Sequence, residues 1–144
     1  MDISDKTKQM IQNRKTQKSL ESFVNHLTTK YLKVYGMCLS FDIHFVQRLN
    51  ERSHPDIVTK MLTRLVKYKI CECVYFHEMY GNKDGAVLKF GTYIIPIRIV
   101  KYKNDTAIKL QTIFRMDTCR NFKPHRIIDL KECRFDDVNW LDNL

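Results

Sequence analysis

Three side chains suited to phosphate chemistry recur at four-residue intervals in the segment 41–52, FDIHFVQRLNER. These side chains are His44, Arg48 and Arg52. Residues four apart stack on one face of a helix, so a helix here would place one imidazole and two guanidiniums in a row. The neighbouring apolar stripe of such a helix would consist of Phe45, Val46 and Leu49.

Histidine and arginine together can cleave RNA without a metal ion. The 2′-hydroxyl must lose a proton, the phosphorane must be stabilised, and the 5′-oxygen must gain a proton. An imidazole, with an ordinary pKa of about 6.5, can transfer protons near neutral pH. A guanidinium binds two phosphate oxygens and stays charged. We therefore interpret His44 as a general base or acid and Arg48 as a phosphate ligand. The alternative is a solvated surface with Glu51 as the local counter-ion.

Composition bounds the class of protein. The chain has 144 residues, a formal net charge of +9 and 44% hydrophobic residues. That length suits one domain, and the charge favours a polyanionic partner, with nucleic acid ahead of an anionic membrane surface. We find no apolar run long enough to span a membrane and no secretory signal in MDISDKTKQM. These features predict a cytoplasmic protein that binds no membrane.

The five cysteines form an odd set without a secretory signal, which favours reduced thiols. A zinc site can be drawn from Cys71, Cys73, Cys119, His125 and Cys133, but the spacing of these residues is unlike that of zinc ligands. Small buried hydrophobic side chains are the better interpretation for at least three of the thiols. We therefore expect neither a metal nor a cofactor.

The order of elements predicts an α+β fold. Residues 1–18 form a basic arm, and residues 19–144 form a single domain that ends in an acidic tail. Apolar spacing predicts helices over 19–33, 41–52 and 55–69, and a short extended segment over 37–41. Strands are expected at 70–77, 86–90, 93–102 and 107–116, with a short strand or helical turn at 127–130. The helices would pack on one face of a four-stranded antiparallel meander.

Basic side chains on the strands would then line the other, free face of the sheet. The candidates are Lys89, Arg98, Lys101, Lys109 and Arg115. Alternation along the fourth strand predicts that Lys109, Gln111 and Arg115 share a face. Pro96 within the third strand requires a sheet edge or a bulge.

The motif and the order of elements resemble the RelE-like endoribonucleases, and within them most closely the phage RegB endoribonucleases. The resemblance rests on the pattern His-x-x-x-Arg-x-x-x-Arg at 44–52, a preceding extended segment, a following amphipathic helix, and then the strands, over roughly residues 35–116. It implies a phage-encoded, metal-independent enzyme that cleaves messenger RNA through attack by the 2′-hydroxyl, leaving a 2′,3′-cyclic phosphate. His44 would match the essential histidine and Arg48 the arginine one turn later.

The resemblance also implies a strand arginine at the site, for which Arg115 is the nearest equivalent. RegB carries a second histidine on the following helix, where this chain has Arg64 and Lys67. The second proton-transfer group is therefore open among His54, His77 and His125. The expected substrate-binding residues are Arg52, Arg64, Lys67, Lys89, Arg98 and Lys101.

Two other functions remain compatible with the sequence. One is a module that binds RNA, DNA or a ribosome without cutting. The other is a phage protein that docks on a host protein. Cleavage that depends on His44 would separate the enzyme from both.

Overall fold

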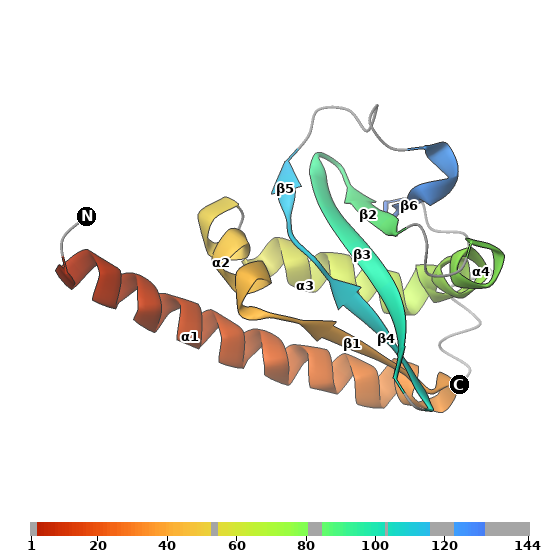
Figure 1. Cartoon of the computed structure of the whole chain (residues 1–144), viewed down its shortest axis with the longest axis horizontal. Coiled ribbons are helices and arrows are strands. Elements are labelled where there is room, and N and C mark those ends of the chain that lie inside the picture. The colour runs from red at the N-terminus through yellow and green to blue at the C-terminus, as the bar shows by residue number, and fades with distance from the viewer. Residues whose placement is uncertain (1–2, 53–54, 81–84, 103, 116–122, 132–144) are drawn as a thin grey trace.

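The structure is a computed structural model that describes residues 3–52, 55–80, 85–102, 104–115 and 123–131. Within these ranges it has an α+β architecture in which helices cover one face of a mixed sheet (Figure 1). The predicted acidic tail and His54 lie outside the described residues.

Helices make up most of the first half of the chain. α1 runs from Ile3 to Leu27 and continues into a π turn, Thr28–Leu32, and a 3-10 turn, Lys33–Tyr35. The helix expected over 19–33 therefore begins at Ile3, within the segment expected as an arm. Gly36 ends it with a φ of 66°, which glycine adopts without steric cost. α2 spans Ile43–Arg52 and α3 spans Pro55–Arg64, followed by a π turn at Leu65–Lys69 and by α4, Ile70–Tyr80.

The strand predicted at 70–77 is wrong, because this segment is α4. Its β-branched, aromatic and cysteine residues favoured a strand, but burial follows a helical period. Ile70, Cys73 and Phe76 are buried, three residues apart, while Cys71 is exposed. Tertiary packing of this apolar face outweighs local propensity. The strand prediction placed Cys71 and Cys73 on one face. In the helix they lie on different faces, because Cys73 is buried and Cys71 is exposed.

The sheet has more strands than predicted, and it is mixed. Its strands are β1 (Met37–Phe41), β2 (Ala86–Phe90), β3 (Tyr93–Tyr102), β4 (Asp105–Leu110), β5 (Phe114–Arg115) and β6 (Ile127–Asp129). The order is β1-β4-β3-β2-β6, and β5 also pairs with β3. The β2–β3 and β3–β4 pairs are antiparallel as predicted, but β1 joins β4 and β6 joins β2 in parallel. The four-stranded antiparallel meander is thus corrected to a mixed sheet.

A bulge separates β4 from β5. Arg98 pairs with Lys109 and Ile97 with Leu110, whereas Ile94 pairs with Phe114. The strand that contains β4 and β5 therefore has one more residue than β3 opposite Pro96. Proline cannot donate to the ladder, and of the two alternatives predicted for Pro96, a sheet edge or a bulge, the register fits the bulge, with the extra residue on the partner strand. One extra residue moves every later side chain to the opposite face.

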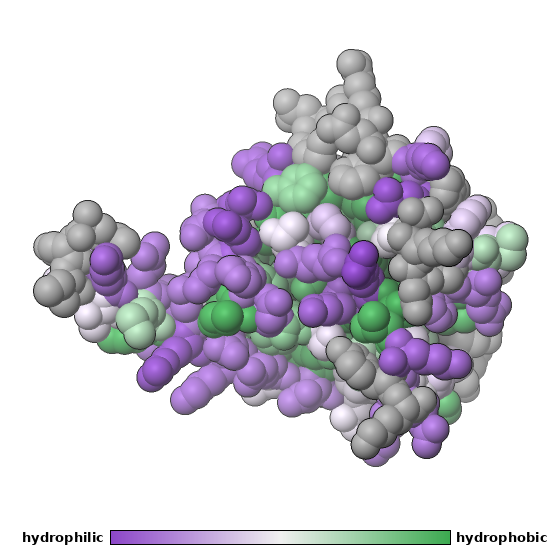
Figure 2. Space-filling view, viewed as in Figure 1, coloured by the Kyte–Doolittle hydropathy of each residue, from purple (hydrophilic) through white to green (hydrophobic). Residues whose placement is uncertain are grey.

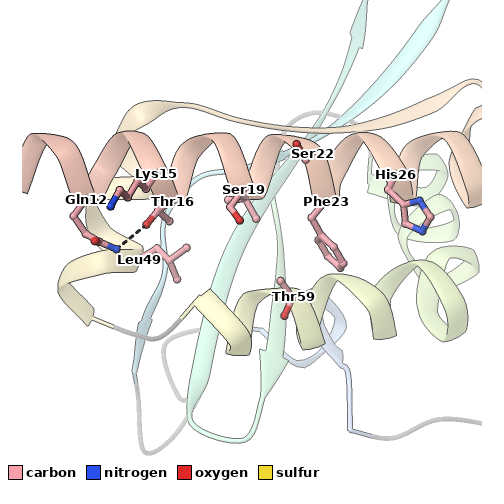
Figure 3. Close-up of a pocket in the computed structure, with 10 residues that line it drawn as sticks. Gln12, Lys15, Thr16, Ser19, Ser22, Phe23, His26, Leu49 and Thr59 are labelled. Atoms are coloured by element: carbon pink, nitrogen blue, oxygen red, sulfur yellow. Dashed lines mark hydrogen bonds between the residues drawn. The ribbon is translucent and has the colours of Figure 1, made fainter.

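The core lies between the helices and one face of the sheet. α1 and α3 lie on the same side of the strands, as Figures 1 and 3 both show. The core residues from the strands include Leu39, Leu88, Ile95, Ile97 and Ile108. The first half of α1 projects beyond this body (Figure 1), and its surface is mostly hydrophilic (Figure 2).

Candidate functional site

The helix that carries the predicted catalytic row forms as expected. The carboxylate of Asp42, just before α2, accepts a hydrogen bond from the Phe45 backbone N–H at 3.2 Å, which caps the first turn. Phe45, Val46 and Leu49 are fully buried. Their burial fixes the rotation of α2, so the row of His44, Arg48 and Arg52 lies outside the core, and all three side chains are exposed.

Arg48 has a counter-ion on its own helix. Its Nη1 atom lies 2.8 Å from Oε2 of Glu51, and both side chains are nearly half exposed, at 44% and 47%. An exposed pair of this kind contributes at most about 1 kcal/mol, so a phosphate can displace Glu51 at small cost. Arg48 therefore remains able to bind an anion.

Arg52 joins the end of α2 to the sheet. Its Nη1 atom donates a hydrogen bond to the carbonyl oxygen of Ile113 at 3.2 Å. Ile113 is buried in the core and directly precedes β5, which carries Arg115. The contact therefore places the C-terminal end of α2 beside β5 (Figure 1).

The bulge determines the direction of Arg115. Without the extra residue, Arg115 would share a face with Lys109, as the alternation predicted. In the structure Arg115 instead pairs with Tyr93 and lies over its ring, 5.2 Å from the ring centroid. Tyr93 packs against the core on the helix side of the sheet. Arg115 therefore lies on the same side as α2, and the prediction that it shares a face with Lys109 is wrong.

We call the surface formed by His44, Arg48, Arg52 and Arg115 the α2–β5 corner. Along α2 each four-residue step advances roughly 6 Å, so His44 lies next to Arg48 and roughly 12 Å from Arg52. One phosphate can lie between the imidazole and Arg48, and a second phosphate can lie near Arg52 and Arg115. The corner thus suits successive phosphates of one strand better than a single isolated anion.

The basic residues of the other sheet face form a separate group. Arg98 and Lys109 are cross-strand neighbours there, and Lys89 lies on the same face by alternation. The Nζ atom of Lys89 lies 3.7 Å from a carboxylate oxygen of Asp129. The sheet separates this group from the α2–β5 corner.

Lys101 and His77 lie far from the corner. They line a cavity of about 470 Å³ beside α4, and Nδ1 of His77 is buried with no hydrogen-bond partner among the described residues. Lys101 and Tyr93 are at opposite ends of β3, roughly 26 Å apart at the usual strand rise. His77, which lines the same cavity as Lys101, therefore lies towards the opposite end of β3 from Arg115. His125 lies in a 3-10 turn, Pro124–Arg126.

Arg64 has structural partners. Its Nε donates to the carbonyl of Leu130 and its Nη2 to the carbonyl of Lys131, the latter at 3.2 Å. The guanidinium also lies 5.7 Å and 5.8 Å from the ring centroids of Tyr68 and Phe90. These contacts attach the segment after β6 to α3, which accounts for Arg64 without a substrate.

A groove between α1 and α3 was missed by the sequence analysis. It consists of two hollows of about 620 Å³ and 540 Å³ that share Phe23 and Thr59. In Figure 3, Phe23 extends from α1 towards Thr59 on α3. The second hollow is lined by both Arg64 and Lys67. The predicted site residues thus fall into four places: the corner, the opposite sheet face, the far end of β3 and this groove. The opposite face is not wholly free as predicted, because three apolar residues on it are buried: Val87, Ile94 and Ala107.

The α1–α3 groove is polar at its α2 end. The Thr16 hydroxyl is buried and donates to Oδ1 of Asn50 on α2 at 3.0 Å, while Nδ2 of Asn50 donates to Oδ1 of Asn13 at 2.7 Å. Gln12 donates to the Thr16 hydroxyl at 3.5 Å (Figure 3). These bonds hold α1 and α2 together, so the groove and the corner share one rigid helix pair.

Two of the three described thiols, those of Cys38 and Cys73, are unsuited to nucleophilic chemistry. Burial, reinforced by the charge of Glu72, raises the pKa of the Cys73 thiol to about 12. Burial also raises the pKa of Cys38, with Asp105 adding to the effect. A protonated thiol is a poor nucleophile and a poor metal ligand. Among the described residues no group of three or more histidine, cysteine or acidic side chains could hold a metal ion.

Comparisons with known proteins find no matching family model, no matching curated protein and no matching solved structure. None of the helices in the described part of the chain has the length and apolar character needed to cross a membrane.

Proposed function

We propose that this protein is a metal-independent endoribonuclease that cleaves RNA through attack by the 2′-hydroxyl on the adjacent phosphorus, with mRNA as the substrate that the resemblance to the RegB endoribonucleases implies. His44 transfers the proton, and Arg48 stabilises the charge on the phosphorane. Arg52 and Arg115 hold the neighbouring phosphate. The products carry a 2′,3′-cyclic phosphate and a 5′-hydroxyl.

The observation that carries this proposal is the bulge opposite Pro96. It turns Arg115 away from Lys109 and towards the side of the sheet on which α2 lies. The hydrogen bond from Arg52 to the carbonyl of Ile113 fixes α2 beside the same strand. Arginines of two elements therefore lie on one side of the sheet, beside a helix that also carries an exposed imidazole. Bulges frequently redirect a side chain beside an active site.

The roles follow from the chemistry of the groups. An arginine keeps its proton, so it can stabilise developing negative charge but cannot accept the proton of the 2′-hydroxyl. The imidazole of His44 can accept this proton and can also donate one. Within the described part of the corner no second histidine lies beside α2. We therefore assign the proton that the leaving 5′-oxygen gains to water or to the His44 imidazolium formed in the first step.

The alternative function is RNA binding without cleavage. The α1–α3 groove favours this alternative, because it is lined by cations and hydroxyl groups and could bind RNA without the catalytic groups of the α2–β5 corner. Docking on a host protein is a third possibility, and the exposed apolar side chains of α4, Tyr75 and Met79, favour it.

Cleavage of a labelled RNA in EDTA tests the proposal. We expect the wild-type protein to produce fragments that end in a 2′,3′-cyclic phosphate, identified by mass spectrometry. His44→Gln should lower the rate by about 10²–10⁴-fold, the usual contribution of general acid–base catalysis. Lys30→Gln, which removes an exposed charge away from α2, serves as the control and should retain the wild-type rate.

Two results would contradict the proposal. One is intact RNA in the presence of a folded wild-type protein that binds it. The other is cleavage by His44→Gln at the wild-type rate.

A further inference from the structure

The two hollows between α1 and α3 form one continuous groove. The first is lined by residues of α1, by Leu49 of α2 and by Thr59 of α3. The second continues from Thr59 along α3 to Tyr68 and Phe90. From Gln12 to His26 the α1 wall alone extends for about 20 Å at the usual helical rise. The groove is thus an elongated channel, as Figure 3 shows for its first half.

The charge of this channel has one sign. Its cationic and ionisable basic residues come from both helices: Lys15, His26, Lys60, Arg64 and Lys67. Its hydroxyl groups are those of Thr16, Ser19, Ser22, Thr59 and Thr63. None of the described lining residues is aspartate or glutamate. Thr16, Thr59 and Thr63 donate their hydroxyl protons within the protein, to acceptors on Asn50, Asp56 and Thr59. Ser19 and Ser22 therefore have the hydroxyls that remain able to donate to a phosphate. A concave surface with cations of one sign concentrates anions, and lysines are common phosphate ligands.

The channel also contains aromatic surface. Phe23 lies at the junction of the two hollows, and Tyr68 and Phe90 line the second. Arg64 already covers Tyr68 and Phe90, whereas Phe23 lies among the hydroxyl groups of α1 and α3. An aromatic ring inside a basic groove is the combination with which proteins bind single strands, because each unpaired base can stack on it.

We propose that the α1–α3 groove binds a single-stranded segment of RNA beside the cleavage site. Lys15, Lys60 and Lys67 contact its phosphates, and Phe23 stacks against one base. A duplex would keep its bases from Phe23, so the groove favours single strands. This inference rests on the proposed function in taking RNA as the substrate, but it assigns a binding site away from the α2–β5 corner.

The position of the groove relative to α2 supports the assignment. Leu49 closes one end, and the hydrogen bond between Thr16 and Asn50 fixes α1 to the helix that carries His44. An RNA strand that leaves the groove at this end therefore passes α2, the helix that carries His44. The projecting half of α1 adds further exposed cations, including Lys6 and Lys8, along the same helix.

Charge reversal with an uncleavable ligand tests the inference. The ligand is a fluorescent single-stranded RNA whose 2′-hydroxyls are all methylated, so binding is measured whether or not the protein is a nuclease. The test variant is Lys15→Glu/Lys60→Glu/Lys67→Glu. The control variant is Lys30→Glu/Lys33→Glu/Lys123→Glu, whose lysines are exposed and line neither hollow. Both variants lower the formal net charge from +9 to +3, because each exchange removes two units.

We expect the test variant to raise the Kd by more than about tenfold and the control variant to raise it by less than about threefold. The slope of log K against log salt should flatten by about 2 in the test variant, since each single-strand phosphate contact contributes about 0.7. The double variant Lys15→Glu/Lys60→Glu changes only exposed side chains and should lose affinity in the same direction if the triple variant folds poorly.

Three outcomes would overturn the inference: equal losses in the test and control variants, wild-type affinity in the test variant, or a poly-glutamate peptide that binds the groove as tightly as the RNA. Loss of binding in the test variant alone would support it even if the wild-type protein cleaves no RNA. The failure of the proposed enzyme and the failure of the proposed groove are therefore distinguishable.

Discussion

The α2–β5 corner and the α1–α3 groove are both basic, but they are built in different ways. In the corner, three of the four side chains come from one ten-residue helix, and they lie exposed on its outer side. The groove takes its lining from α1, α2, α3, the following π turn and β2, and it is concave. Groups on one helix have a fixed spacing, which suits chemistry at a defined atom. A long channel with many donors suits binding of a flexible chain.

The two regions nevertheless share a support. Phe45 and Leu49 hold α2 in the core, and the Asn50 amide joins it to α1. We therefore expect different effects on stability and RNA binding from three kinds of variant. They change the buried core contact of α2, the hydrogen bond between α1 and α2, and the counter-ion of Arg48.

The largest effect is expected from Phe45→Ala. Phe45 is fully buried and its ring lies 6.2 Å from that of Phe41. Removal of a buried phenyl group typically lowers the free energy of unfolding by about 3–5 kcal/mol, which chemical denaturation measures. Ile43→Ala is the control, because Ile43 is 42% exposed and should change stability by less than about 0.5 kcal/mol. Equal losses in the two variants would show that α2 is not fixed by this core contact.

A smaller effect is expected from Thr16→Val. The exchange keeps the shape of the side chain but removes the hydroxyl that donates a hydrogen bond to Oδ1 of Asn50. The loss should lower the free energy of unfolding by about 1–3 kcal/mol. Ser19→Ala changes an exposed hydroxyl in the same groove and should be close to neutral. Thermal unfolding of both variants measures the difference, and an unchanged Thr16→Val protein would argue against the hydrogen bond as the link between α1 and α2.

The smallest effect on stability is expected from Glu51→Gln. The ion pair with Arg48 is exposed, so the free energy of unfolding should change by less than about 1 kcal/mol. Arg48 would lose its counter-ion, and the methylated RNA should bind more tightly by up to about fivefold, the effect of one nearby charge in water. Weaker binding by this variant would place Arg48 outside the RNA contact.

The corner was partly predictable from sequence because its main features are local. The period of Phe45, Val46 and Leu49 fixes a helix, and the same period places His44, Arg48 and Arg52 in a row. The position of Arg115 was not predictable by alternation, since one extra residue opposite Pro96 reverses its face. Proline indicated that a bulge was possible, but not on which side of the ladder the extra residue would be placed.

The groove and the sheet edges were not predictable because they depend on contacts distant in sequence. The parallel pairing of β1 with β4 joins segments separated by three helices, and no local pattern encodes it. Residues 70–77 show a conflict between two local signals. The strand propensity of their side chains was followed, although Ile70, Cys73 and Phe76 also have the spacing of a buried helix face. An error there produced the wrong number of antiparallel strands.

The most direct test of the account is a pair of measurements on the same variants: the Kd for methylated RNA and the single-turnover cleavage rate at saturating unmodified RNA. We predict that His44→Gln loses at least about 10²-fold in rate and keeps its Kd, because the imidazole acts only on the reacting proton. The triple groove variant should lose affinity and keep its rate at saturation. A His44→Gln protein that cleaves at the wild-type rate would contradict the assignment of catalysis to the α2–β5 corner.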